Sequence, residues 1–264
     1  PSHPDLLDWL ASEYVSSGWD TKSLHRLIVT SATYRQSSAA SPELVAIDPE
    51  NRLLARGPRF RMSAETIRDV ALAASGLLQR RLGGPSVKPY QPDGLWKEIA
   101  TTTNYVQSQG ADLYRRSLYT YWKRTVVPPV MSAFDAASRE TCVVRQDRTN
   151  TPLQALATLN ETAFVEAARV LAERVLTDES DPQQRIVLAF RRVLSRRPSD
   201  EELAVLSAGL DEHRAYYRAH PDLATQLVGI GEATRYFDGR DAELAAYTTL
   251  ASLIFNLDQT VTKE

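Results

Sequence analysis

The sequence has almost no cysteine. Cys142 stands alone among 264 residues, which excludes an internal disulfide, a cysteine-rich zinc site and a C-x-x-C-H haem attachment. A solitary cysteine is more often a small buried hydrophobic residue than a nucleophile, so we expect Cys142 to be buried. Secreted proteins need not carry disulfides, so the scarcity of cysteine leaves the compartment open.

Long apolar segments are also missing. The longest uncharged stretch of apolar character is Leu244–Leu257, and Thr, Ser and Asn interrupt it. Its 14 residues are too few to cross a bilayer, so we expect no membrane span. The chain begins Pro1-Ser2-His3-Pro4, without an initiating Met or a signal-peptide pattern, and we therefore expect a fragment or a processed chain.

Neither sign of charge dominates. Lys and Arg total 31 and Asp and Glu total 33, a formal net charge of −2, which argues against a protein that coats nucleic acid. The apolar fraction of 43% and the charged fraction of 24% are those of an ordinary globular domain. Arginine outnumbers lysine 26 to 5. A GC-rich genome explains that bias most simply, and recognition of planar anions is the alternative.

Helix start signals recur along the chain. Asp20 and Ser63 precede amphipathic stretches and are typical N-caps. The segments Thr151–Gln154 and Ser199–Glu202 have the pattern of capping boxes. These signals predict helices on both sides of a central region.

The central residues 85–150 lack a sustained 3.6-residue period and contain five prolines. Three short stretches there are rich in β-branched and aromatic residues and predict strands, namely Thr102–Gln107, Leu118–Lys123 and Thr141–Arg145. The sequence therefore predicts a mainly α, helical bundle-like fold with a small irregular β insertion around residues 95–150. We expect a single domain over residues 1–264, with helical blocks at 1–84 and 151–264.

Basic and aromatic residues are concentrated in residues 112–148. Seven basic and four acidic side chains give this segment a charge of +3, while the rest of the chain carries −5. An anionic glycan, a nucleotide or an acidic partner would require such a surface. The alternative is bracing, in which the arginines bond carbonyls and nearby acids to fix an irregular segment. The candidate ligand-binding residues are Arg116, Tyr119, Lys123, Arg124, Arg139, Arg145 and Arg148.

The sequence gives weaker evidence for other kinds of site. Asp135 and Glu140 could supply the paired carboxylates of a glycosidase, but any two acids five residues apart in a loop would give the same pattern. Four scattered histidines without metal-ligand spacing predict no metal site. Gly83-Gly84 follows a helix instead of opening one, so neither a phosphate loop nor a cofactor is expected.

Several long motifs resemble those of one family. The segments are Tyr114–Arg124, Phe134–Ala136, Arg139–Arg145, Arg148–Leu156, Tyr34–Ser38, Asp48–Leu54 and Asn256–Asp258. They resemble the domain-of-unknown-function family 1553, also called the planctomycete PSD-one domain, over nearly the whole chain. The resemblance implies the C-terminal part of an exported bacterial protein, periplasmic or extracellular, with a cytochrome-c-like and other domains ahead of it. It implies no catalytic residues.

The sequence thus predicts a non-catalytic binding or assembly module that contacts domains of the same parent protein or an anionic polysaccharide. A polysaccharide-active hydrolase or a redox-linked enzyme is the alternative, since carbohydrate-binding and cytochrome-like domains often accompany the family. An enzyme needs a pocket where titratable groups with perturbed pKa values converge. A binding module would instead present a flat or structurally saturated surface.

Overall fold

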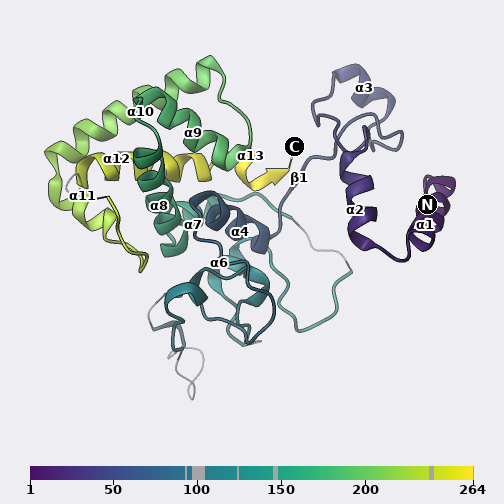
Figure 1. The fold of residues 1–264 in the computed structure, drawn as a ribbon, viewed down its shortest axis with the longest axis horizontal. Coiled ribbons are helices and arrows are strands. Elements are labelled where there is room, and N and C mark those ends of the chain that lie inside the picture. The colour runs from purple at the N-terminus through teal and green to yellow at the C-terminus, as the bar shows by residue number, and fades with distance from the viewer. Residues whose placement is uncertain (93, 97–104, 124, 145–147, 238–240, 264) are drawn as a thin grey trace. The chain divides into compact units, whose positions relative to one another are not determined.

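The computed structural model is mainly helical, as predicted (Figure 1). It divides into two compact units, Pro1–Phe60 with Thr262–Glu264 and Arg61–Val261, which are described separately. The strands that it describes, β1 (Phe60–Arg61) and β2 (Thr262–Lys263), form a two-stranded sheet. The described residues are 1–92, 94–96, 105–123, 125–144, 148–237 and 241–263.

The smaller unit contains the helices α1 (Pro4–Ser16), α2 (Thr21–Thr30) and α3 (Pro42–Ile47). Asp20 caps α2 as predicted, because its carboxylate accepts hydrogen bonds from two backbone N–H groups of the first turn at 2.9 and 3.1 Å. None of these three helices has a buried residue. The apolar side chains of α1 and α2 therefore remain at the surface of this unit.

The larger unit is centred on two long helices, α8 (Thr162–Asp178) and α12 (Asp241–Phe255), which pack against each other (Figure 1). Shorter 3₁₀ turns, η1 (Gly110–Tyr114) and η2 (Ser117–Tyr119), lie in the irregular segment. The remaining helices are α4 (Ala64–Ser75), α6 (Pro129–Ala133), α7 (Pro152–Asn160), α9 (Pro182–Leu194), α10 (Asp200–Ala219), α11 (Pro221–Val228) and α13 (Asp258–Val261).

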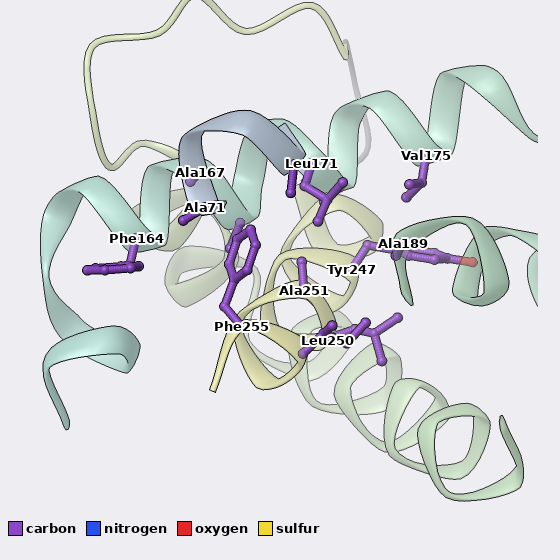
Figure 2. Packing of buried hydrophobic residues seen from close by; sticks show 14 of the residues in the cluster. Ala71, Phe164, Ala167, Leu171, Val175, Ala189, Tyr247, Leu250, Ala251 and Phe255 are labelled. Atoms are coloured by element: carbon purple, nitrogen blue, oxygen red, sulfur yellow. The ribbon is translucent and has the colours of Figure 1, made fainter. Parts of the chain in front are cut away.

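The core forms where α8 and α12 meet. Ala167, Ala172, Ala245 and Ala246 are fully buried, and such small side chains let the two helix backbones approach closely. Larger side chains such as Phe255 fill the space around them (Figure 2). Because α12 is apolar around most of its circumference, it is buried among α8, α9, α10 and α11.

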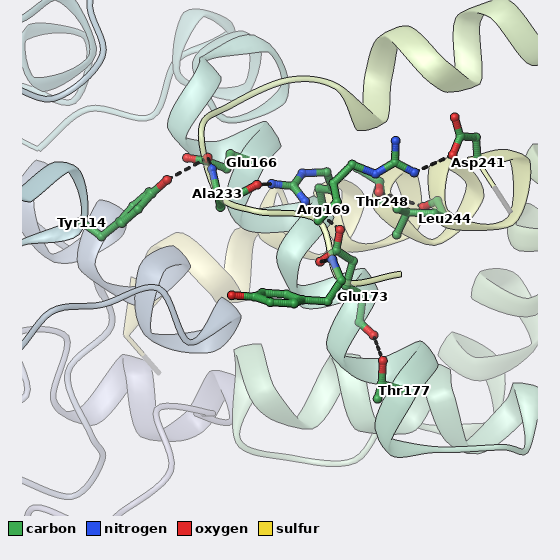
Figure 3. A network of polar contacts seen from close by, with 11 residues as sticks. Tyr114, Glu166, Arg169, Glu173, Thr177, Ala233, Asp241, Leu244 and Thr248 are labelled. Carbon is green, nitrogen blue, oxygen red and sulfur yellow. Dashed lines mark hydrogen bonds and ion pairs between the residues drawn. The ribbon is translucent and has the colours of Figure 1, made fainter. Parts of the chain in front are cut away.

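One side of α8 carries a buried carboxylate, Glu166, which is 0% exposed. Its Oε1 accepts hydrogen bonds from the Tyr114 hydroxyl at 2.9 Å and the Ala233 N–H at 2.6 Å (Figure 3). It also accepts one from the Tyr90 hydroxyl at 3.2 Å. Burial and the Glu166 charge raise the pKa of Tyr114, so its hydroxyl remains a donor. This carboxylate therefore ties the irregular segment and the loop before α12 to the central helix.

A buried ion pair one turn further along α8 strengthens that attachment. Arg169 Nη1 lies 2.6 Å from Glu173 Oε1, and Arg169 Nη2 donates to the Ala233 carbonyl at 2.7 Å (Figure 3). The second Glu173 oxygen accepts the Tyr236 N–H at 3.4 Å. Further hydrogen bonds offset the cost of burying an ion pair, and the loop supplies one to each member here.

The strand predicted over Leu118–Lys123 does not form. Its first residues belong to η2, and isolated bridges join Thr120 to Val87 and Lys123 to Val126. Residues 105–107 and 141–144 are also not strands, while residues 102–104 and 145 lie outside the described residues. The predicted β insertion is thus wrong for the part of residues 95–150 that the structure describes.

Side-chain hydrogen bonds replace strand pairing in this segment. Arg68 on α4 is 5% exposed, and its guanidinium donates to the Leu113 and Arg115 carbonyls at 2.7 and 3.0 Å and to Ser117 Oγ at 3.1 Å. The Arg115 guanidinium, in a residue 1% exposed, donates to three carbonyls between residues 81 and 85. Backbone groups that would otherwise need a β-ladder are therefore satisfied by buried arginines.

Gly231 provides a test of the Glu166 attachment. It has a φ of +92°, and a Cβ added there would overlap the Glu166 side chain. We expect Gly231→Ala to lower the free energy of unfolding by about 2 kcal/mol or more, from left-handed strain and displacement of the carboxylate. Urea unfolding measures the change.

The matched control is Gly209→Ala inside α10, where an added methyl group meets nothing within 4 Å. Alanine favours a helix interior over glycine by about 1 kcal/mol, so this variant should be slightly more stable than the parent chain. Equal effects of the two substitutions would contradict the attachment described for Glu166.

Candidate functional site

Two members of the predicted ligand surface lie beside α4 and the Gly83 turn. Arg116 Nε is 3.6 Å from Asp69 Oδ2. The Tyr119 hydroxyl accepts the Gly83 N–H at 2.8 Å, and the Arg115 guanidinium stacks 3.8 Å from the centre of the Tyr119 ring. Both residues therefore have partners within the fold.

Two further members contact other parts of the irregular segment. The Arg139 guanidinium lies 4.5 Å from the centre of the Trp122 ring, and Arg148 Nη1 donates to the Arg61 carbonyl at 2.9 Å. Arg124 and Arg145 lie outside the described residues. The described arginines of the set are thus engaged in separate local contacts of the kind that the bracing alternative expects.

Asp135, one of the two carboxylates considered for glycoside cleavage, is also engaged. Its Oδ2 accepts hydrogen bonds from Arg61 Nη2 at 2.6 Å and from the N–H and hydroxyl of Thr149, each at 2.9 Å. Burial raises the pKa of Asp135, but these hydrogen bonds and the Arg61 charge bring it below its ordinary value. Asp135 is therefore an ionised anchor for the start of the Thr149 segment.

Lys123 belongs to a different arrangement, which we call the lysine–aromatic cluster: Lys88, Trp96, Tyr105, Tyr121 and Lys123. The Trp96 ring centre lies 5.2 Å from that of Tyr105 and 6.1 Å from that of Tyr121. Lys88 Nζ lies 5.1 Å from the Tyr121 ring centre and 5.8 Å from that of Tyr105, and Lys123 Nζ lies 5.0 Å from that of Trp96. Two ammonium groups and three aromatic rings therefore share one location.

Short hydrogen bonds fix two of the three rings of the lysine–aromatic cluster. The Trp96 indole N–H donates to Gln91 Oε1 at 2.6 Å, and the Tyr105 hydroxyl donates to the Pro89 carbonyl at 2.5 Å. Trp96 is 6% exposed, whereas the two lysines and two tyrosines are half-buried. The Trp96 and Tyr105 rings are thus held in place while the lysines remain accessible from solvent.

A pocket of about 190 Å³ adjoins the same Pro89–Pro92 segment. It lies among that segment, the start of α6 and the start of α8. Apolar side chains such as Met131 line it together with the polar side chains of Arg68, Thr120 and Glu161. Pockets for drug-sized ligands begin at roughly 300 Å³, so this one fits a smaller molecule.

Glu161 is the titratable group of this pocket that the sequence analysis missed. It caps α8, where its Oε2 accepts the N–H groups of Ala163 and Phe164 at 3.0 and 3.3 Å. Burial raises the pKa of Glu161 to about 7, although the Arg68 charge and these hydrogen bonds act in the opposite direction. Both protonation states are therefore populated at neutral pH. Glutamate is not a preferred N-cap, so its residue type did not mark Glu161 as one. The sequence signal for Glu161 was its position between two helices.

The smaller unit has a wider, mainly apolar groove of about 880 Å³. Its lining includes Trp9, Leu10, Ile28, Tyr34 and Leu54. A groove of this composition is typical of a contact surface for another apolar surface and offers little for chemistry.

Three expectations about other sites can be checked. Cys142 is exposed, so the expectation of a buried residue is wrong, since its neighbours form a surface loop and not an apolar face. Among the described residues, no group of three His, Cys, Asp or Glu side chains is placed to hold a metal ion. Every described helix is too short or too polar to cross a lipid bilayer.

Comparison with known proteins identifies the family. A family model described as "Protein of unknown function (DUF1553)" matches residues 1–210. The chain belongs to this family. Neither the curated proteins nor the solved structures contain a match. The DUF1553 match includes the lysine–aromatic cluster and all the pocket residues, and it ends in α10 of this protein.

Glu161 makes the stability of this DUF1553 protein pH-dependent. The folded chain holds the Glu161 proton up to about pH 7, whereas the unfolded chain releases it near pH 4.5, so stability falls as pH rises through that window. We expect Glu161→Gln to match the parent chain near pH 4.5 and to exceed it at pH 8 by about 3 kcal/mol. Urea unfolding at the two pH values measures this difference.

Glu202 is a control of opposite sign. A hydrogen bond from Arg196 lowers the pKa of Glu202 to about 2, so its stabilising contribution is lost as pH falls. Glu202→Gln should therefore lower stability at pH 7 by more than at pH 2. A Glu161→Gln variant with the pH dependence of the parent chain would show that Glu161 titrates as an ordinary exposed carboxyl group.

Proposed function

We propose that this protein is a non-catalytic binding module that holds a negatively charged polysaccharide on the lysine–aromatic cluster. The observation that carries the proposal is the placement of the Lys88 and Lys123 ammonium groups beside three aromatic rings. Ammonium groups form charge-assisted hydrogen bonds with carboxylates and sulfates. Aromatic rings offer apolar faces to the C–H groups of a sugar.

Lys88 is better placed for this role than the described arginines of the predicted ligand surface. Arg116, Arg139 and Arg148 already contact a carboxylate, an aromatic ring and a carbonyl. Among the described residues, no carboxylate forms an ion pair with the Lys88 ammonium. Lys123 is the member of the predicted ligand surface that belongs to the cluster.

One observation favours a polysaccharide-active hydrolase instead, namely the raised pKa of Glu161 in a pocket. Glycoside cleavage ordinarily uses two carboxyl groups. Glu161 is the one acidic side chain among the described residues that line the pocket, so binding is the better supported function. The proposal also includes an exported bacterial parent protein, periplasmic or extracellular, with a cytochrome-c-like or other domain as partner, on the strength of the motif resemblance.

The proposal is tested by titrating the protein with sulfated and carboxylated oligosaccharides at low salt. Lys88→Ala combined with Lys123→Ala should weaken binding by about tenfold, since two charge-assisted contacts are lost. Added salt should weaken binding to the parent chain, because exposed charges are screened beyond about 8 Å at physiological ionic strength. Isothermal titration calorimetry measures both effects.

Lys22→Ala combined with Arg197→Ala is the matched control, since both residues are exposed and lie outside the cluster. This variant removes the same charge and should bind like the parent chain. Equal losses of affinity in the two double variants would show that binding depends only on the net charge of the protein, which would contradict the proposal. Absence of any binding, with a lowered unfolding temperature for the Lys88 and Lys123 variant, would assign the cluster to bracing and contradict the proposal.

A further inference from the structure

The pocket at the start of α8 contains an unsatisfied hydroxyl group. Thr120 is 4% exposed, lines the pocket, and its Oγ1 has no hydrogen-bond partner among the described residues. Leaving a buried polar group unpaired costs about 1–3 kcal/mol. A molecule in the pocket that pairs with this hydroxyl would recover that free energy.

The charges that line the pocket argue against an ionic ligand. Arg68 contributes a positive charge, but three of its N–H groups are already bonded to Leu113, Arg115 and Ser117. Glu161 contributes a negative charge when ionised and uses one oxygen to cap α8. A carboxylate ligand would be repelled by Glu161 and an amine by Arg68, so an uncharged molecule suits the site best.

Two amide side chains supply further hydrogen-bonding groups. Gln91 uses its Oε1 to accept the Trp96 indole N–H, which leaves its NH₂ group to donate. Asn160 donates its Nδ2 to the Leu156 carbonyl, which leaves its Oδ1 to accept. Donors and acceptors are therefore both available around the pocket, as a molecule with several hydroxyl groups requires.

The remaining walls are apolar and the volume is small. Four prolines, Val130 and Met131 surround the space of about 190 Å³. Proline rings and methyl groups pack against C–H groups, and this volume holds one small ring. We propose that the pocket binds one uncharged sugar ring or a similar small polyol, whose hydroxyl groups pair with Thr120 Oγ1, the Glu161 carboxyl group and the amides of Gln91 and Asn160.

This site is separate from the lysine–aromatic cluster, although both contact the Pro89–Pro92 segment. A failure of sugar binding in the pocket would therefore leave the proposed binding of an anionic polysaccharide to the cluster untouched, and the reverse also holds. Binding of a neutral sugar should resist added salt, whereas binding of an anionic oligosaccharide to the cluster should not.

The test uses D-glucose, D-galactose, D-mannose and myo-inositol, each titrated into the folded chain and followed by protein NMR. We expect at least one to bind, and Thr120→Val to weaken that binding by about tenfold, roughly 1.4 kcal/mol. Thr120→Ser keeps the hydroxyl group and should retain binding. Because Thr120→Val removes an unpaired hydroxyl, it should fold at least as stably as the parent chain.

Thr248→Val is the matched control, since Thr248 is a buried threonine in α12 that bonds its own helix at 2.8 Å and lies outside the pocket. It should leave sugar binding unchanged. Failure of all four probes to bind, or equal binding by Thr120→Val and the parent chain, would overturn the proposal. So would a destabilised Thr120→Val, because the hydroxyl would then have a partner in the free protein.

Discussion

The hydrogen bonds from the buried Arg68 guanidinium are the interaction on which the rest of the site depends. The described part of the segment between α4 and α6 has no β-ladder, so its backbone polar groups need other partners. Arg68 on α4 donates hydrogen bonds to the Leu113 and Arg115 carbonyls. The Arg115 guanidinium in turn donates to three carbonyls between residues 81 and 85. Burial lowers the pKa of Arg68, and nearby acids including Glu161 oppose that shift. These acids thus favour the charged form of the buried guanidinium.

Two neighbouring residues show how this anchoring creates both candidate sites. Thr120 lines the pocket, while Tyr121 belongs to the lysine–aromatic cluster. Adjacent residues of one short stretch therefore contribute to two sites. On α8, the Glu166 carboxylate accepts a hydrogen bond from Tyr90. Tyr90 lies between Pro89 and Gln91, which line the pocket and also bond the rings of the cluster. The irregular segment is therefore positioned by α4 and α8 together.

The parts of the fold that the sequence predicted are those set by local chemistry. Asp20, Ser63 and Ser199 each cap a helix as expected, because a cap depends on residues within one turn. The predicted strand over Leu118–Lys123 failed because β-branched and aromatic content indicates a half-buried surface, whereas a ladder needs a distant partner strand. Among the described residues, the distant partner of this stretch is Val87, which pairs with Thr120 in an isolated bridge that does not extend into a ladder. Likewise, the excess of positive charge in residues 112–148 pointed to Lys123 but not to Lys88 or Glu161, whose surroundings depend on burial and pairing in three dimensions.

The central claim is that the ligand surface lies on the lysine–aromatic cluster. The four tryptophans report on this claim, because Trp96 lies in the cluster, Trp122 stacks with Arg139, and Trp9 and Trp19 belong to the smaller unit. The most direct measurement is the ¹H–¹⁵N spectrum of their indole groups during titration with a sulfated oligosaccharide at low salt. The account predicts a shift of the Trp96 signal and unchanged signals from Trp9 and Trp19. A shift confined to Trp122, or no shift at all, would contradict it.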